Sequence, residues 1–306
     1  MVDERDFQLL ANLLKEPLAS NEELGRRVRL SGTAVKTRLE GLAEEGVFGG
    51  LYGIPAPEVF QRQRHVYVFR GERVNATAPH KAIQIDPVVS VHLRQDGNLP
   101  AILYEPPNES ADPPEELVRT FGAPAFSVLP RPFQAPPKGT VLSPIDWRVM
   151  RPLIREPRMP IRTLAERTGL SPKTVRRHRD ALLRDGALTI EVHVRGARAR
   201  GLLLYNLWLT LPHLPARDRH AILTKLPRCV VVNVMQEPPA IYLFCRADAY
   251  SDVLADETMA KELAGTDRFG LVFPLDTAFA TDRLESWVDA ELARWSSRRG
   301  AEPTRS

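Results

Sequence analysis

The chain has 306 residues, which is long for one domain and enough for two to four small ones. Hydrophobic residues make up 43% and charged residues 26%, a balance typical of folded domains that excludes a disordered chain. The net charge is +4 with a pI near 9.2, and arginine clearly outnumbers lysine, which favours contact with phosphate or carboxylate groups.

The sequence predicts a cytoplasmic protein with no membrane partner. Residues 1–7 are acidic where a secretory signal would carry a basic and then an apolar segment. The longest apolar stretch, residues 201–211, is about half the length of a membrane-spanning helix. Two cysteines, Cys229 and Cys245, provide neither a disulfide framework nor a metal-ligand set, so we expect two reduced, buried thiols.

An internal repeat organises the chain. Residues 6–46 match residues 146–186 without a gap, with eleven identical pairs in 41 positions, and the same offset continues into the strand-like segments that follow. Two copies with so long a period indicate a domain duplication. We therefore predict an α+β fold with two winged helix-turn-helix domains and two ferredoxin-like βαββαβ domains in tandem. The expected boundaries are 1–54 for the first winged helix-turn-helix, 64–131 for the first ferredoxin-like domain, 132–142 for a proline-rich linker, 143–198 for the second winged helix-turn-helix, and 201–298 for the second ferredoxin-like domain with a C-terminal helix.

The second copy shows the helix-turn-helix pattern most clearly. Apolar residues at helical spacing between 149 and 154 predict a first helix that stops near Pro157. Residues 161–168 predict a second helix, ended by Gly169. Ser171 is then an N-cap, with Pro172 at the first position of a third helix that runs to about residue 185. A glycine turn between two short helices is typical of a helix-turn-helix.

The third helix carries the predicted DNA-binding residues. Those of the second copy are Ser171, Lys173, Thr174, Arg176 and Arg177, and those of the first copy are Thr33, Lys36 and Thr37. Residues 146–188 contain eleven basic and five acidic residues, a balance of +6, whereas residues 3–48 contain seven basic and nine acidic ones, a balance of −2. Basic side chains release phosphate counterions, and arginine can bind guanine through two hydrogen bonds. The second copy is therefore predicted to do most of the DNA reading.

Strand-like segments follow each third helix, at residues 47–54 and 187–195, in the position of a wing. The second is followed by basic residues that could reach the DNA backbone or minor groove, namely Arg195, Arg198 and Arg200.

The rest of each copy predicts a ferredoxin-like domain. In the second copy the expected order is strand 203–209, helix 216–226, strands 229–235 and 241–246, helix 249–264 and strand 269–273. In the first copy the strands are expected near 66–70, 88–94, 101–104 and 125–129. One face of such a sheet must be covered by the other copy or by a second chain. Apolar residues on one face of 283–298 predict a C-terminal docking helix.

These features resemble the Lrp/AsnC family of bacterial and archaeal regulators. The segment Leu-Ala-Glu-Arg-Thr-Gly-Leu-Ser-Pro-Lys-Thr-Val-Arg-Arg, residues 164–177, is very similar to the recognition-helix region of that family. The resemblance implies double-stranded DNA as a partner, assembly as a homo-oligomer or an internal pseudo-dimer, and an amino acid as a possible effector. A Gly-Asp-containing turn belongs to the family's effector region. The first copy has Asp96-Gly97-Asn98, whereas residues 236–239 of the second copy lack the glycine, so sensing and simple assembly both stay open.

Two alternatives to a sequence-specific transcriptional regulator remain. Siroheme decarboxylases resemble Lrp/AsnC proteins that act on a tetrapyrrole, and such an enzyme would need histidine and arginine in a cleft. The candidates His65, His92, His193 and His213 are scattered along the sequence, and the basic second helix-turn-helix favours DNA. The other alternative is an architectural protein that coats DNA without a specific site. No catalytic or metal-binding motif stands at a useful spacing, so the sequence predicts no enzyme activity, cofactor or metal.

Overall fold

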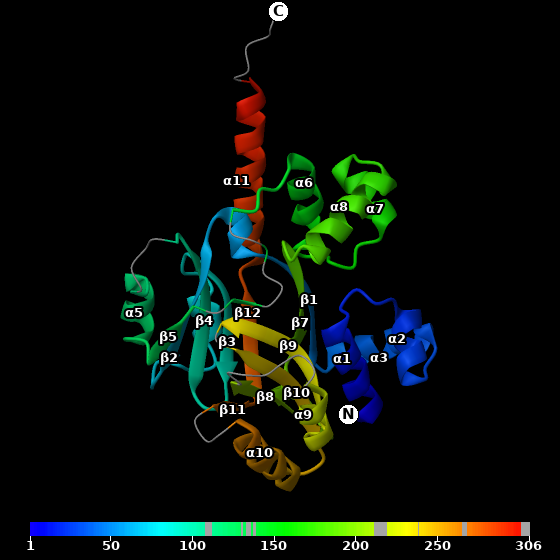
Figure 1. Ribbon diagram of the computed structural model, residues 1–306, viewed down its shortest axis with the longest axis vertical. Helices are drawn as coiled ribbons and strands as arrows, with labels where there is room; N and C mark the ends of the chain where they lie inside the picture. Colours follow the sequence, from blue (N-terminus) through cyan, green and yellow to red (C-terminus); the bar gives the residue numbers. More distant parts are fainter. Residues whose placement is uncertain are drawn as a thin grey trace, which may run out of the picture.

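The computed structural model describes residues 1–107, 112–129, 131–132, 136, 139–210, 219–237, 239–264 and 268–300. Two small helical units lie on one side of the molecule, and two antiparallel sheets with their covering helices make up the other side (Figure 1). Within the described ranges, no helix is both long and apolar enough to cross a membrane.

The first helical unit consists of α1 (Glu4–Lys15), α2 (Asn21–Val28) and α3 (Gly32–Glu44). Asp3 and Ser20 form capping boxes at the starts of α1 and α2, which satisfies backbone N–H groups that have no partner inside a helix. The three helices bury a shared set of apolar residues, among them Leu9, Leu13, Leu24 and Val35.

The second helical unit repeats this plan with α6 (Pro144–Leu153), α7 (Ile161–Thr168) and α8 (Pro172–Arg184). The predicted caps are confirmed. Ser171 Oγ accepts a hydrogen bond from Thr174 N at 3.2 Å, and Gly169 ends α7 with a φ of 64°, a left-handed conformation that glycine adopts at little cost.

The strands after the two helical units pair with each other. β1 (Phe48–Pro55) and β7 (Leu188–Val194) form an antiparallel two-stranded ribbon in which Tyr52 lies opposite Glu191. Each copy contributes one strand of this ribbon. The segments expected in the place of two separate wings therefore form one joint between the two copies.

Both α/β domains have the predicted βαββαβ order. The first contains β2 (Gln63–Arg70), α4 (Ala78–Ala82), β3 (Val88–Arg94), β4 (Asn98–Glu105), α5 (Glu115–Phe121) and β5 (Phe126–Val128). The second contains β8 (Leu203–Thr210), α9 (Arg219–Lys225), β9 (Cys229–Glu237), β10 (Ala240–Ala247), α10 (Tyr250–Ala264) and β11 (Phe269–Val272). The strands of the second domain lie in the order β11-β8-β10-β9, and the equivalent strands of the first domain lie in the reverse order, β3-β4-β2-β5. The two sheets therefore have the same topology.

The two copies exchange their last strands. β12 (Pro274–Phe279), from the second copy, pairs with β3 in the first sheet, and β6 (Arg131–Pro132), from the first copy, pairs with β9 in the second sheet. The predicted linker 132–142 thus begins inside a strand, and 133–135 and 137–138 lie outside the described residues. Short 3₁₀ helices, η1 (Pro57–Phe60) and η2 (Gly196–Arg198), follow β1 and β7.

Each helical unit packs against elements of the other copy. Phe7 of α1 stacks on Phe244 of β10, with 5.3 Å between ring centroids. In the second unit, Trp147 of α6 stacks on Phe60 at 5.4 Å. The predicted C-terminal docking helix is α11 (Thr281–Gly300), whose buried Leu284 and Val288 join the core around α6. The chain therefore forms an internal pseudo-dimer, which was one of the two assemblies expected from the sequence.

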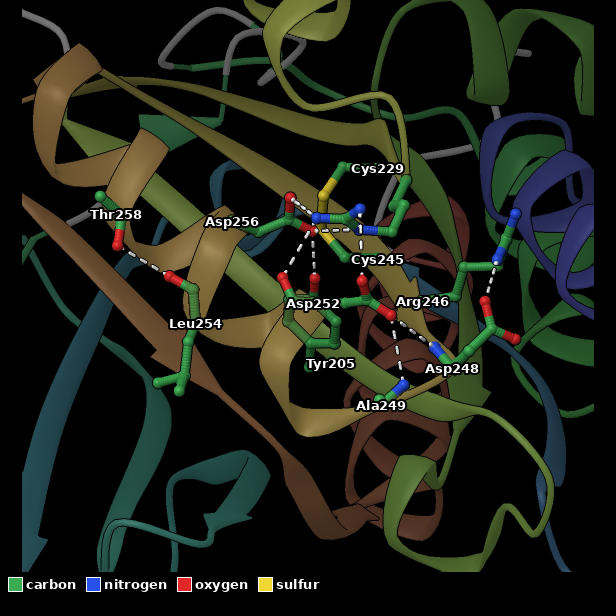
Figure 2. A network of polar contacts seen from close by, with 11 residues as sticks. Tyr205, Cys229, Cys245, Arg246, Asp248, Ala249, Asp252, Leu254, Asp256 and Thr258 are labelled. Atoms are coloured by element: carbon green, nitrogen blue, oxygen red, sulfur yellow. Dashed lines mark hydrogen bonds and ion pairs between the residues drawn. A yellow bond between two sulfur atoms is a disulfide. The ribbon is translucent and has the colours of Figure 1, made fainter.

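The expectation of two reduced thiols was wrong. Cys229 and Cys245 lie directly opposite each other on β9 and β10, with Cα atoms 4.1 Å apart, and form a disulfide. Their sequence separation of 16 residues does not reveal the register of the β9–β10 hairpin, and this register brings the sulfurs together. Figure 2 shows the disulfide beside Tyr205 and Asp256.

Candidate nucleic-acid interface and buried histidine cluster

Helix α8 presents a basic surface on its solvent side. Val175 and Leu182 are buried and hold the helix against its unit, while Lys173, Arg176 and Arg177 are exposed. The exposed residues follow the outward face that helical spacing predicts. The other two predicted DNA-binding residues of this copy have a different setting, because Ser171 is the N-cap and the half-buried Thr174 hydrogen-bonds to it.

The charges on this face are available to a ligand. Among the residues that the structure describes, no carboxylate lies within ion-pair distance of Lys173, Arg176 or Arg177. Arg177 contacts the neighbouring His178, with 3.0 Å between Nη2 and Nε2. A cation that is already paired must break that pair before it binds phosphate, so unpaired cations favour phosphate contact.

Helix α3 offers much less positive charge. Thr33, Lys36 and Thr37 are exposed on it, as predicted, but Lys36 lies 3.7 Å from Glu40 on the same helix. Arg38 is drawn inward to Asp6, with 2.7 Å between Nη1 and Oδ1. The only lysine or arginine among the three predicted residues is therefore partly neutralised.

The three basic residues after β7 lie at the joint between the copies. Arg195 Nε is 3.3 Å from Asp276 Oδ1 on the exchanged strand β12, so its charge is satisfied within the protein. Arg198 is exposed on η2, and Arg200 is exposed just before the second α/β domain. DNA contact by Arg198 and Arg200 stays a prediction. For Arg195, the ion pair with Asp276 argues against DNA contact.

Two of the histidines that are far apart in the sequence meet in the structure. His92 on β3 and His193 on β7 both contact the ring of Phe279, at centroid distances of 6.3 and 5.7 Å. His193 also lies 6.4 Å from Tyr52 on β1. Elements of both copies thus form one cluster at the joint. The sequence-based expectation of scattered histidines was wrong for His92 and His193.

The other two histidines lie elsewhere. His65 follows Arg64 on β2, so its side chain points to the opposite face of the sheet from Arg64. There it is buried, hydrogen-bonded to Glu105 and stacked on Tyr67. His213 lies outside the described residues.

The two clustered histidines are neutral at pH 7. Burial lowers the pKa of His193 to about 4, and the nearby Arg195 adds to this effect. Burial also lowers the pKa of His92 to about 3, together with the positive charges of Arg94 and Arg64. His92 is hydrogen-bonded to Thr277 through Nδ1 at 3.3 Å.

Arginines complete the cluster. Arg64 on β2 lies over the ring of Tyr104, and its Nη2 is 3.5 Å from the Tyr104 hydroxyl. Burial lowers the pKa of Arg94 on β3, and Tyr242 on β10 acts against this shift. Within the described part of the chain, neither arginine has a carboxylate at ion-pair distance. Two cations and two neutral imidazoles can bind a polar or anionic ligand.

Other parts of the described structure offer no comparable set of side chains. An open groove of about 450 Å³ runs along β1 and residues 155–160, but Arg155 and Glu156 are already paired with Glu285 and Arg167. In the described ranges, no three histidine, cysteine or acidic side chains are placed to hold a metal ion.

The comparisons with known proteins agree with the helical units. A model of a winged helix-turn-helix DNA-binding family matches residues 2–48 and 142–189, one match in each copy. The tandem winged helix-turn-helix form predicted from the sequence is thereby confirmed. No curated protein matches the chain.

Among solved structures, the siroheme decarboxylase NirDL is 16% identical over 95% of this chain and 99% of its own, with a TM-score of 0.42. The leucine response regulatory protein LrpA of Mycobacterium tuberculosis is 20% identical over 42% of this chain and 91% of its own, with a TM-score of 0.31. AsnC of E. coli is 12% identical over 42% of this chain and 89% of its own, with a TM-score of 0.27.

These matches correct one expectation. The sequence-based conclusion that the chain is no enzyme is contradicted, because solved structures that match along 94–95% of the chain are of a siroheme decarboxylase. The conclusion rested partly on scattered histidines, and the fold brings His92 and His193 together.

Proposed function

We propose that this chain is a sequence-specific, DNA-binding transcriptional regulator of the Lrp/AsnC type, acting in the cytoplasm and reading DNA mainly through α8. The observation that carries this proposal is the exposed set of Lys173, Arg176 and Arg177, which has no carboxylate partner among the described residues. In this proposal the α/β domains hold the two copies together.

The placement of the two helical units supports this function. Both lie on the same side of the molecule, and the β1–β7 ribbon runs between them and the sheets (Figure 1). One chain then presents two helix-turn-helix units, as a dimeric regulator does with two subunits. Because α8 carries free cations and α3 does not, the two contacts are unequal, and we expect an asymmetric operator.

Electrophoretic mobility shift with genomic operator candidates tests the proposal. The Arg176→Ala/Arg177→Ala variant should lose specific binding and lower the slope of log K against log salt by about two, since each phosphate contact contributes about 0.9. Lys36→Ala/Thr37→Ala is the matched control on α3 and should weaken binding much less. Equal losses in both variants, or unchanged affinity in the first, would contradict the assignment to α8.

Footprinting separates a regulator from an architectural protein. Discrete protected sites over a genomic library are expected of a regulator, whereas uniform protection at the same occupancy would indicate non-specific coating.

A tetrapyrrole enzyme related to siroheme decarboxylase is the second candidate function. The observation that favours it is the cluster of His92, His193 and Arg64 at the joint between the copies. A guanidinium can hold a substrate carboxylate, and a neutral imidazole can accept or donate a proton. A Soret-region change and CO₂ release on incubation with siroheme, both abolished in His92→Phe and His193→Phe, would support it. A regulator without this activity would show neither signal.

A further inference from the structure

One histidine connects the exposed cations of α8 to a carboxylate on α6. His178 Nδ1 lies 2.6 Å from Asp146 Oδ1, and His178 Nε2 lies 3.0 Å from Arg177 Nη2. The side chains of His178 and Asp146 are only 15% and 18% exposed, whereas Arg177 is exposed to solvent. Asp146, His178 and Arg177 thus form a hydrogen-bonded triad that runs from a largely buried carboxylate to the DNA-binding face.

The partners of His178 define which of its nitrogens carries the proton. A guanidinium can only donate, so Nε2 must accept from Arg177. Burial raises the pKa of Asp146, but hydrogen bonds from Ser143 and His178 outweigh burial and lower it overall, so the carboxylate is ionised at pH 7 and can only accept. Nδ1 is then the donor to Asp146, and the imidazole of the triad is neutral.

The carboxylate at the inner end of the triad is itself fixed. Asp146 Oδ2 accepts hydrogen bonds from the backbone N and the hydroxyl of Ser143, at 2.8 and 2.6 Å. The other oxygen, Oδ1, accepts from His178. The capping box that begins α6 therefore sets the position of the imidazole, and the imidazole holds the Arg177 guanidinium.

The other two cations on this face have no such support. Within the described part of the chain, Lys173 and Arg176 have no side-chain hydrogen bond or ion pair. An arginine side chain loses rotamer freedom when it binds a ligand, so an arginine that is already oriented binds at a lower entropy cost. Arg177 is therefore the cation of α8 that is best prepared for a contact of defined geometry.

The first copy has no equivalent triad. Arg38 takes the place of His178, and its Nη1 lies 2.7 Å from Asp6, so the carboxylate is bound directly by a guanidinium. Thr37 takes the place of Arg177. An arginine at position 38 offers no acceptor to a neighbouring donor, so the triad distinguishes the second recognition helix from the first.

We propose that His178 is a positioning residue that orients Arg177 for contact with a base edge in the major groove, while Lys173 and Arg176 mainly supply charge. This inference rests on the function proposed for α8. Bidentate contact with guanine requires the guanidinium fork in one orientation, whereas attraction to phosphate requires only a nearby charge. The charge of Arg177 contributes to the salt dependence of binding in either case.

Three substitutions of His178 separate orientation from folding and from charge. His178→Arg restores the pairing seen in the first copy, which keeps α8 fastened to α6 but offers no acceptor to Arg177. His178→Phe removes both hydrogen bonds. His178→Gln keeps one donor and one acceptor, as in the neutral imidazole. His80→Phe, at an exposed position on α4, is the matched control.

Mobility shift with an operator and with random DNA, at one salt concentration, gives a specificity ratio for each variant. This ratio should fall about fivefold or more in His178→Arg and His178→Phe, because Arg177 must then be ordered when DNA binds. Affinity for random DNA should not fall, since neither change removes a cation from the face. His178→Gln should keep most of the wild-type ratio, and His80→Phe should keep all of it.

Histidine ¹⁵N NMR on the full chain, without DNA, tests the hydrogen bonds directly. The signals of His178 are identified by their absence in His178→Phe. Nδ1 should be protonated and Nε2 should not, and the Nε2 signal should shift in Arg177→Met, which removes its donor. A helix that is merely fastened through Asp146 would show no response of Nε2 to Arg177→Met.

The proposal is overturned if His178→Arg keeps the wild-type specificity ratio, if His178→Gln loses as much as His178→Phe, or if Nε2 is protonated or does not respond to Arg177→Met. Failure of the proposed function gives a different result. A wild-type chain that shows the expected NMR signals but binds no operator would refute the function of α8, and with it the base contact of Arg177, while the hydrogen-bonded triad would stand.

Discussion

His178 Nδ1 lies 2.6 Å from Asp146 Oδ1, which connects the middle of α8 to the start of α6. The equivalent position in the first copy holds Arg38, whose Nη1 lies 2.7 Å from Asp6. Each copy thus fastens its recognition helix to its first helix through the same carboxylate. The second copy uses an imidazole at this position, and Arg176 and Arg177 lie on the exposed side, as the equivalent Lys36 and Thr37 do in the first copy.

Asp146→Asn should lower the free energy of unfolding at pH 7 by about 1–2 kcal/mol. Burial raises the pKa of Asp146, but hydrogen bonds from Ser143 and His178 outweigh burial and lower it overall. A lowered folded-state pKa means that the ionised carboxylate stabilises the fold above its unfolded pKa, near 4, and that this contribution is lost as the pH falls through the folded pKa.

Urea unfolding across pH 7 to pH 3 measures this effect. The difference between wild type and Asp146→Asn should be constant from pH 7 to about pH 5 and should shrink only below about pH 4. Glu44→Gln, an exposed change on α3, is the control and should leave stability unchanged. A difference that disappears by pH 5 would show that another group is responsible.

Arg228→Met should destabilise the second α/β domain by about 3–5 kcal/mol, because it leaves the buried carboxylate of Asp256 without its cation. Arg228 Nη2 lies 2.6 Å from Asp256 Oδ1. Tyr205 donates its hydroxyl to the same carboxylate (Figure 2). Burial and this hydrogen bond raise the pKa of Tyr205, so the phenol stays protonated as a donor.

Tyr205→Phe should cost only about 1 kcal/mol, since Arg228 still pairs with Asp256. Thermal unfolding compares both variants with Arg184→Met, which removes an exposed pair with Asp185 and should change stability by less than about 0.5 kcal/mol. Similar losses of stability in Arg228→Met and Arg184→Met would mean that burial of Asp256 does not determine the cost of removing its cation.

Gly53→Val should separate β1 from the end of α6. A Cβ at Gly53 would lie 2.3 Å from the Leu153 carbonyl oxygen, and Gly53 N donates to the Ile154 carbonyl at 2.9 Å. We expect a loss of about 2 kcal/mol or more in the free energy of unfolding. Gly41→Ala on α3, where nothing lies within 4 Å, should be neutral or stabilise by up to about 1 kcal/mol. Denaturant titration of both variants checks this, and a tolerated Gly53→Val would disprove close packing at this joint.

Thiol titration of the unfolded, unreduced protein should detect no free cysteine, and two should appear after reduction. Because the disulfide closes a short loop, Cys229→Ala/Cys245→Ala should lower stability by about 3 kcal/mol at most. Two reactive thiols in the unreduced protein would restore the sequence-based expectation.

The sequence alone determined the features that depend on local interactions. Ser171, Gly169 and the spacing of Val175 and Leu182 specify the ends and the buried face of the recognition helix, because capping and helical periodicity act within a few residues. The repeat and the order of strands and helices in both α/β domains were readable for the same reason. The exposed cations on α8 followed directly from that face.

Only the tertiary structure decided which distant segments meet. The pairing of β1 with β7, the exchange of β6 and β12, and the cysteine register depend on packing between strands that are far apart in the chain. His92 and His193 lie on strands of different copies, and no local pattern connects them. Their meeting around Phe279 results from strand exchange, because β12 carries that ring from the second copy into the sheet of the first.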